Sequence, residues 1–390
     1  MRIRHLCLLF LLMLSSSTHN KSDELEDNAL IIQNTVEYNF KNKHDLESII
    51  HALEGFLNTK NDSYLSNEFW IENDNSFYKY PFFEISNLEN FGGMILKPSL
   101  LSVTQINSEH FICKLGWFYN NEKSRSLQYI YNVSVVKKNE TFLLKNILEY
   151  NIKDWEKKEI KRVTYWTDNS HKINIEKADE FNDINNKLST FFQSDVISFN
   201  YVLCNSNNEL MRLIGYDFES SMFFSNQNGS IAFPDDRLIF SGNNNEINTH
   251  ELVHLYLTEK FKNLNPYMNE GVASLFGGSK GLEYKDHLHK LKTHLISNEI
   301  DIYQEYFFGN YVIDFDTSLR YTLSAFICEL TLKKFGKDKL FELINCGKSN
   351  YDIINYIKKY FEVNPNDFND FIKYELENYD FEKRPKKLFY

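Results

Sequence analysis

Apolar residues in the first half of the chain follow a helical period and then an alternating one. Leu46, Ile49, Leu53 and Leu57 recur every three or four residues and would share one face of a helix. Apolar and other residues then alternate over 111–117 and 127–135, as in strands that bury one face. A polar turn at 138–140 leads into a further apolar run over 142–148. The pattern predicts one helix followed by an antiparallel sheet.

A leading helix followed by a curled antiparallel sheet resembles the cystatin-like and NTF2-like folds. This resemblance is carried by the order of the elements alone. It implies an N-terminal α+β domain over residues 28–157. The chain changes character near residue 158, where we place the domain boundary.

The second half mixes strand and helix patterns and then becomes helical. The predicted elements are a strand at 163–167, a helix capped by Asn174, a strand at 197–204, a short helix from Asn207 to Gly215 and a strand at 238–240. From about residue 317 the pattern is helical, and its strongest helix runs from Leu319 to Phe335 and stops at Gly336. Two further helices are expected near 350–361 and 366–378.

The segment from His250 to His254 contains the sequence H-E-x-x-H. One helical turn takes about 3.6 residues, so both imidazoles lie on one face and can bind one metal ion. Glu251 is rotated by about 100° and can reach a water on the metal without being a ligand. The asparagines at 243–245 supply turn and capping chemistry before this helix.

A third ligand is expected from the next helix. Asn265-Pro266 marks a turn and a helix start, and Glu270 follows about one turn later. An antiparallel return of the chain would bring Glu270 back to the level of the two histidines, because each residue advances about 1.5 Å. The sequence therefore predicts one Zn2+ ion held by His250, His254 and Glu270.

Here a family resemblance becomes specific. His250-Glu251-Leu252-Val253-His254, followed by Asn269-Glu270-Gly271-Val272-Ala273, resembles the H-E-x-x-H … N-E-x-x-A signature of gluzincins, which include thermolysin and the zinc aminopeptidases. By this resemblance His250, His254 and Glu270 would be the zinc ligands and Glu251 the general base of a peptidase. The implied fold class is α+β, with a thermolysin-like zinc metallopeptidase domain and a helical C-terminal lobe over 158–390.

The resemblance extends beyond the two motifs. A strand, helix and strand, then an edge strand that ends at 240–242, precede H-E-x-x-H as in the gluzincin catalytic domain. Tyr321 resembles the family's tyrosine that stabilises the oxyanion, and Tyr303, Tyr306 and Tyr311 compete for this role. The G-x-M-E-N motif of the aminopeptidases is absent, and residues 229–236 stand in its approximate place. That segment could pair with an extended peptide substrate as an edge strand.

Two alternatives compete with the peptidase. The chain could be a non-catalytic exported binding protein whose zinc site is structural, with four protein ligands, or vestigial. The N-terminal domain could also cover the cleft, as in a zymogen. A second histidine group, His287, His289 and His294, is interpreted as a solvated helix face, because His287 and His289 point about 200° apart on a helix.

Charge and the N-terminus narrow the partners and the location. The formal net charge is −11, which argues against nucleic acid and leaves a peptide or protein as the expected substrate. Residues 1–18 begin with basic residues, continue with a short apolar run and end in serines, so they predict a cleaved signal peptide and an exported protein. An uncleaved anchor is the alternative, and no other stretch is long enough to cross a membrane. No cysteine pair has C-x-x-C spacing, and the pattern leaves open whether the cysteines form disulfides or buried thiols.

Overall fold

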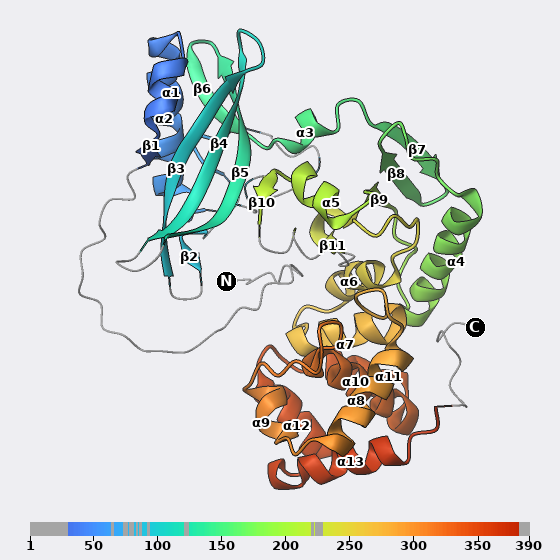
Figure 1. Cartoon of the computed structure of the whole chain (residues 1–390). Coiled ribbons are helices and arrows are strands. Elements are labelled where there is room, and N and C mark those ends of the chain that lie inside the picture. Colours follow the sequence, from blue (N-terminus) through green and yellow to red (C-terminus); the bar gives the residue numbers. More distant parts are fainter. Residues whose placement is uncertain are drawn as a thin grey trace.

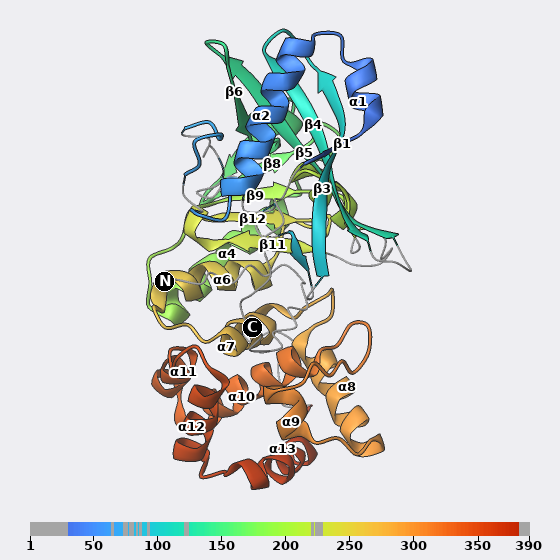
Figure 2. The ribbon, with the colours of Figure 1, turned by 90° about the vertical axis from the view of Figure 1, so that its left-hand side faces the viewer.

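A computed structural model describes residues 30–381 except for 64–65, 73–76, 78–81, 83–84, 86–87, 92–93, 121–124, 220–221 and 223–228. The predicted leader, residues 1–18, lies outside the described residues. Two β-sheets and a helical lobe follow one another from top to bottom in Figure 1 and Figure 2. The α+β class predicted from the sequence is confirmed.

The first sheet packs one face against helix α2 (Figure 2). Its elements are β1 (Ile31–Ile32), α1 (Asn34–Asn39), α2 (Lys43–Thr59), β2 (Asn90–Phe91), β3 (Met94–Gln105), β4 (His110–Asn120), β5 (Arg125–Lys138), β6 (Thr141–Lys145), α3 (Leu148–Asn151) and β10 (Tyr216–Phe218). The predicted helix corresponds to α2, and the two alternating runs to β4 and β5. Asn139 and Glu140 both have positive φ, at 50° and 65°, which forms a tight hairpin between β5 and β6.

One strand of this sheet comes from the second half of the chain. β10 pairs antiparallel with β5, with Tyr216 opposite Tyr131. β6 pairs only with residues 134–138 of β5, so the preceding part of that edge is available to β10. The first sheet therefore extends beyond the predicted boundary at 157/158.

The second sheet has parallel strands at its centre and an antiparallel strand at each edge. Its elements are β7 (Glu156–Ile160), β8 (Val163–Thr167), α4 (Ile175–Phe192), β9 (Phe199–Leu203), α5 (Asn207–Leu213), β11 (Ser230–Phe233), a 3-10 turn η3 (Pro234–Asp236) and β12 (Leu238–Ser241). The strand order is β11-β12-β9-β8-β7. The prediction that the strand at 238–240 lies at the edge is wrong, because η3 folds β11 back along it and β11 takes the edge position.

The two faces of this sheet contribute to different hydrophobic cores. Tyr201 and Leu203 of β9 pack with α4 and α6 in one core. Val202 and Cys204 point to the opposite face and join the core of the first sheet. Successive side chains alternate across a strand, so one strand serves both cores.

Helices form the remainder of the described chain. They are α6 (Thr249–Lys260), α7 (Pro266–Gly277), α8 (Tyr284–Ser297), α9 (Ile302–Phe307), α10 (Leu319–Phe335), α11 (Lys337–Ile344), α12 (Asn350–Phe361), η4 (Pro365–Asp367) and α13 (Phe368–Glu377). In both views α6 lies beneath the second sheet, and α7 lies between α6 and the helical lobe. The predicted helices at 319–335 and 350–361 are confirmed. α11 was not predicted, because Gly336 ends α10 and also begins α11.

Two further features bear on the sequence predictions. Among the described residues, no helix has the length and apolar character needed to span a bilayer. Cys113, Cys204, Cys328 and Cys346 are free thiols, and the first three are buried.

Candidate metal centre

Helix α6 is attached to the second sheet at its first turn. Oδ1 of Asn248 accepts a hydrogen bond from the backbone N–H of Glu251 at 3.2 Å and so caps the helix. The side-chain amide of Asn248 donates to Ser230 Oγ of β11 at 2.7 Å and to Ser241 Oγ of β12 at 3.3 Å. The expectation that residues 243–245 cap this helix is wrong. Asn243 instead shapes the preceding turn by accepting from Ser241 Oγ and the backbone N–H of Asn245.

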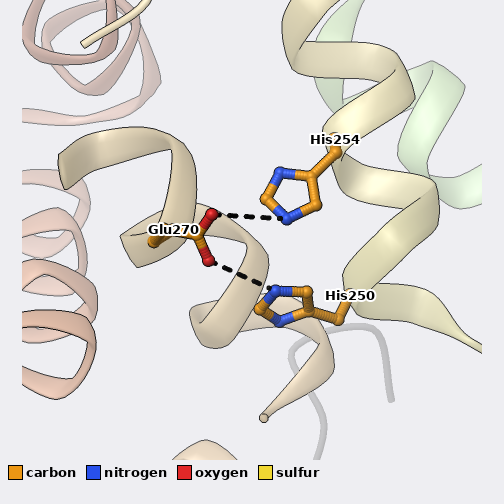
Figure 3. Close-up of side chains that lie close together, drawn as sticks. All are labelled: His250, His254 and Glu270. Atoms are coloured by element: carbon orange, nitrogen blue, oxygen red, sulfur yellow. Dashed lines mark ion pairs between the residues drawn. The ribbon is translucent and has the colours of Figure 1, made fainter. Parts of the chain in front are cut away.

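The three predicted ligand residues meet. Oε2 of Glu270 lies 3.5 Å from Nε2 of His250, and Oε1 of Glu270 lies 3.9 Å from Nε2 of His254 (Figure 3). Two atoms that each lie about 2.0–2.1 Å from one ion at a tetrahedral angle are about 3.4 Å apart. These two separations involve different oxygens of Glu270, and one ligand atom from each residue lies within 4.8 Å of the others, so side-chain adjustments could bring one atom of each residue around one ion.

Glu270 is positioned by helix α7, which lies very close to the backbones of α6 and α10. Its start is fixed by Asn265, whose side chain accepts from the backbone N–H of Tyr267 at 3.0 Å. A Cβ on Gly277 would lie 2.3 Å from the backbone N of His250, so α7 touches the start of α6 there. A Cβ on Gly271, the residue after Glu270, would lie 2.7 Å from the backbone C of Ser324 on α10. These glycines allow α7 to lie against both neighbouring helices.

In each imidazole, Nδ1, the nitrogen that does not face Glu270, donates a hydrogen bond to an oxygen atom. Nδ1 of His250 donates to the backbone carbonyl of Gly278 at 2.6 Å, and Nδ1 of His254 donates to Oδ1 of Asn269 at 3.0 Å. Both bonds place a proton on Nδ1, so Nε2 is the nitrogen of each ring that faces Glu270 and that would bind a metal ion once it is deprotonated. Sequence reasoning did not assign these two roles, although Asn269 lies within the N-E-x-x-A motif and Gly278 within a Gly-Gly pair.

The charges of the three residues suit a cation. Burial by itself would lower the pKa of His250, but the carboxylates of Glu270 and Glu251 and the Gly278 carbonyl raise it to about 9. In the metal-free protein, a proton on His250 therefore balances the charge of Glu270. A metal ion must displace this proton, so binding couples to proton release.

Glu251 is buried beside the cluster. Only 6% of the residue is exposed, and its Oε2 atom has no hydrogen-bond partner among the described residues. Burial raises the pKa of this carboxyl, Glu270 adds to the effect, and the two imidazoles oppose it. The backbone N–H of Ala232 on β11 donates to the carboxylate and lowers its pKa. A buried carboxylate oxygen without a donor fits the proposed role of accepting a proton.

Tyr321 lies in the first turn of α10, the helix that crosses α7. Its backbone N–H donates to the capping Ser318 Oγ at 3.5 Å. It precedes Ser324, which meets Gly271, by about 4.5 Å along the helix axis. Two of the other tyrosines considered for the oxyanion role already have hydrogen-bond partners. The Tyr306 hydroxyl bonds Ser324 Oγ, and the Tyr311 hydroxyl bonds His294 Nε2, both at 2.8 Å.

The third competitor, Tyr303, packs in an aromatic cluster between α9 and α13. Its ring lies 5.1 Å from that of Phe307 and 5.8 Å from that of Phe368, measured between centroids.

The candidate set contains three protein ligands. Within the part of the chain that the structure describes, no other histidine, cysteine or acidic residue joins His250, His254 and Glu270 in the cluster. Comparison of the sequence with known protein families and with curated proteins finds no match.

Proposed function

We propose that the chain is a zinc-dependent peptidase of the gluzincin type. The observation that carries the proposal is the meeting of His250, His254 and Glu270, with the unpaired carboxylate oxygen of Glu251 buried beside them. Three nitrogen and oxygen ligands from adjacent helices are the donor set of catalytic zinc sites, whereas structural sites have four protein ligands. This favours a catalytic site over a structural one.

Zinc held by this set would act as a Lewis acid and make water nucleophilic near neutral pH. Glu251 would accept the proton of the attacking water and later give it to the leaving amine. Its raised pKa suits both steps, because a general base works best when its pKa is near the working pH. Tyr321 would donate a hydrogen bond to the oxyanion.

The substrate proposed for this site is an extended peptide. β11 has one strand neighbour, β12, among the described strands, and its other edge has backbone groups for a further strand. Ala232 of the same strand donates to Glu251, so a peptide paired with β11 would lie beside the general base. We also propose that the protein is exported, on the basis of the predicted leader.

The substitution Glu251→Gln tests the assignment. It removes the base but keeps the shape, so peptide cleavage is expected to fall at least about 100-fold while zinc stays bound. The matched control is Glu259→Gln, an exposed position on the same helix that pairs with Arg237. A zinc-loaded Glu251→Gln protein that cleaves peptides at the wild-type rate would overturn the peptidase proposal. Zinc binding without cleavage by the wild type would favour a binding protein.

A further inference from the structure

His287 is a buried histidine on α8 whose ring contacts Ser279, after α7, and Thr317, before α10. The interpretation of His287 as part of a solvated helix face is wrong: it is 2% exposed, whereas His289 on the same helix is exposed. His287 shares the inward face of α8 with Tyr284, Leu288 and Leu291. Its two ring nitrogens contact two different loops.

Both nitrogens have defined hydrogen-bond roles. Nε2 lies 3.0 Å from both the carbonyl oxygen and Oγ of Ser279, and because the carbonyl can only accept, the proton is assigned to Nε2. Nδ1 then accepts from the hydroxyl of Thr317 at 3.0 Å. One neutral tautomer satisfies both bonds, and burial supports it by lowering the pKa of His287.

The Nε2 bond leads to His250. Ser279 follows Gly278, whose carbonyl accepts from Nδ1 of His250 at 2.6 Å. Ser279 and Leu282 exchange backbone hydrogen bonds of 3.0 and 2.9 Å, so the intervening residues form a closed turn. By holding the Ser279 carbonyl, His287 fixes the turn that orients the His250 ring.

The Nδ1 bond leads to Tyr321. Thr317 is fully buried, and its backbone N–H donates to Oδ1 of Asp314 at 2.8 Å. The next residue, Ser318, caps α10 through the backbone N–H of Tyr321. By holding the Thr317 hydroxyl, His287 fixes the point at which α10 begins.

We propose that His287 is a positioning residue that holds the His250 turn and the start of α10 in a fixed relationship. Its described hydrogen bonds go to Ser279 and Thr317, so it acts on the candidate site through Ser279 on one side and Thr317 on the other. This inference rests on the proposed function. Lys290 on the same helix also pairs with Asp314 at 3.0 Å and Asp316 at 3.7 Å, so the loop stays attached when the His287 bonds are removed.

Four substitutions separate the two connections. His287→Gln places an amide near the position of Nε2 and keeps the Ser279 bond, whereas His287→Asn places one near Nδ1 and keeps the Thr317 bond. His287→Phe removes both bonds, and Thr317→Val removes only the hydroxyl. His289→Gln is the matched control. Zinc affinity is measured by chelator competition, kcat and KM with a peptide substrate, and folding by thermal unfolding.

We expect the substitutions to separate effects on zinc affinity from effects on kcat. His287→Phe and His287→Asn weaken zinc binding about tenfold, because the acceptor of His250 is no longer held. His287→Phe, His287→Gln and Thr317→Val lower kcat about tenfold with KM changed less than about twofold, because the start of α10 shifts. His287→Gln and Thr317→Val keep wild-type zinc affinity, as does His289→Gln. General loss of stability would not separate the variants in this way.

The possible failures are distinguishable. If the wild type does not bind zinc, the proposed function fails and the inference fails with it. If the wild type binds zinc but cleaves nothing, the peptidase fails and the zinc affinities of the Asn and Gln variants still test the Ser279 connection. If all folded His287 and Thr317 variants keep wild-type zinc affinity and kcat, or all lose both together, the positioning role is overturned and the zinc site stands.

Discussion

Nδ1 of His254 lies 3.0 Å from Oδ1 of Asn269, the residue that directly precedes Glu270 on α7. One turn of α7 thus provides a candidate ligand and also the acceptor that orients another ligand. A shift of this turn would disturb two of the three ligand atoms together.

The substitution Asn269→Ala is expected to weaken zinc binding about 10–100-fold, because the His254 ring loses the acceptor that fixes its tautomer and orientation. Asn269→Asp keeps an acceptor oxygen and should bind zinc nearly as well as the wild type. Chelator competition measures both, with the exposed Asn298→Ala as the control. Wild-type affinity in Asn269→Ala would show that this hydrogen bond does not orient the ring.

Gly277→Ala is expected to affect both the fold and the metal centre. The added methyl group would lie 2.3 Å from the backbone N and 2.6 Å from the Cα of His250, so α6 and α7 must separate. We expect a loss of about 1–3 kcal/mol in unfolding free energy and weaker zinc binding. Gly55→Ala, whose Cβ would meet the Phe69 ring in the N-terminal part, should reduce stability alone. Urea unfolding measures the loss of stability, and chelator competition measures zinc affinity. Equal zinc affinity in the two variants would contradict the prediction.

Lys60, at the end of α2, and Glu89 form a buried ion pair, and loss of one partner should destabilise the fold much more than loss of both charges. Lys60 is fully buried, its Nζ lies 2.7 Å from Oε2 of Glu89, and Oε1 of Glu89 accepts from Trp117 Nε1 at 3.0 Å. Burial lowers the pKa of Lys60, and Glu89 opposes this effect.

Lys60→Met leaves the Glu89 carboxylate buried without its cation and should cost about 3–5 kcal/mol of unfolding free energy. Lys60→Met/Glu89→Gln removes the charge and keeps an acceptor for Trp117, so most of this loss should be recovered. A double-mutant cycle by urea unfolding tests the pair. Additive effects of the two substitutions would show that the charges do not interact.

The buried His287 should make stability fall in mild acid. Burial lowers its pKa in the folded protein below the usual 6.5, so the unfolded chain takes up the proton more readily. This contribution is complete above pH 6.5 and is lost as the pH falls from 6.5 toward the folded-state pKa, at up to about 1.4 kcal/mol per pH unit.

In His287→Gln the unfolding free energy should therefore depend less on pH between 7 and 5, while the exposed His289→Gln should follow the wild type. The measurement is urea unfolding with a chelator present, so that zinc release does not contribute. Parallel pH profiles for the wild type and His287→Gln would refute the prediction.

Local patterns predicted much of the site. The spacing of His250 and His254 requires only a helix, and Asn265-Pro266 marks the start of the helix that carries Glu270. The inward position of His287 was also detectable, because Tyr284, Leu288 and Leu291 recur on its side of α8 at helical spacing. The angle between His287 and His289 shows only that they lie on different faces, whereas the apolar residues of α8 show which of these faces is buried.

Long-range pairing was not predictable in this way. Nothing local in residues 216–218 indicates that they join a strand more than 80 positions earlier, since a three-residue strand has no measurable period. The edge position of β11 likewise depends on η3 turning the chain back along β12. Such pairings depend on which backbone edges the other strands leave unpaired.

The alternation along β9 and β12 has a consequence for dissection of the protein. Val202, Cys204, Leu238 and Phe240 are fully buried, and they lie in the core that the first sheet completes. A fragment that begins at residue 158 would expose this apolar row to water and would have no β5 edge to receive β10. The half that carries the candidate metal centre should therefore depend on its N-terminal neighbour for solubility, and the two halves should melt in a single transition.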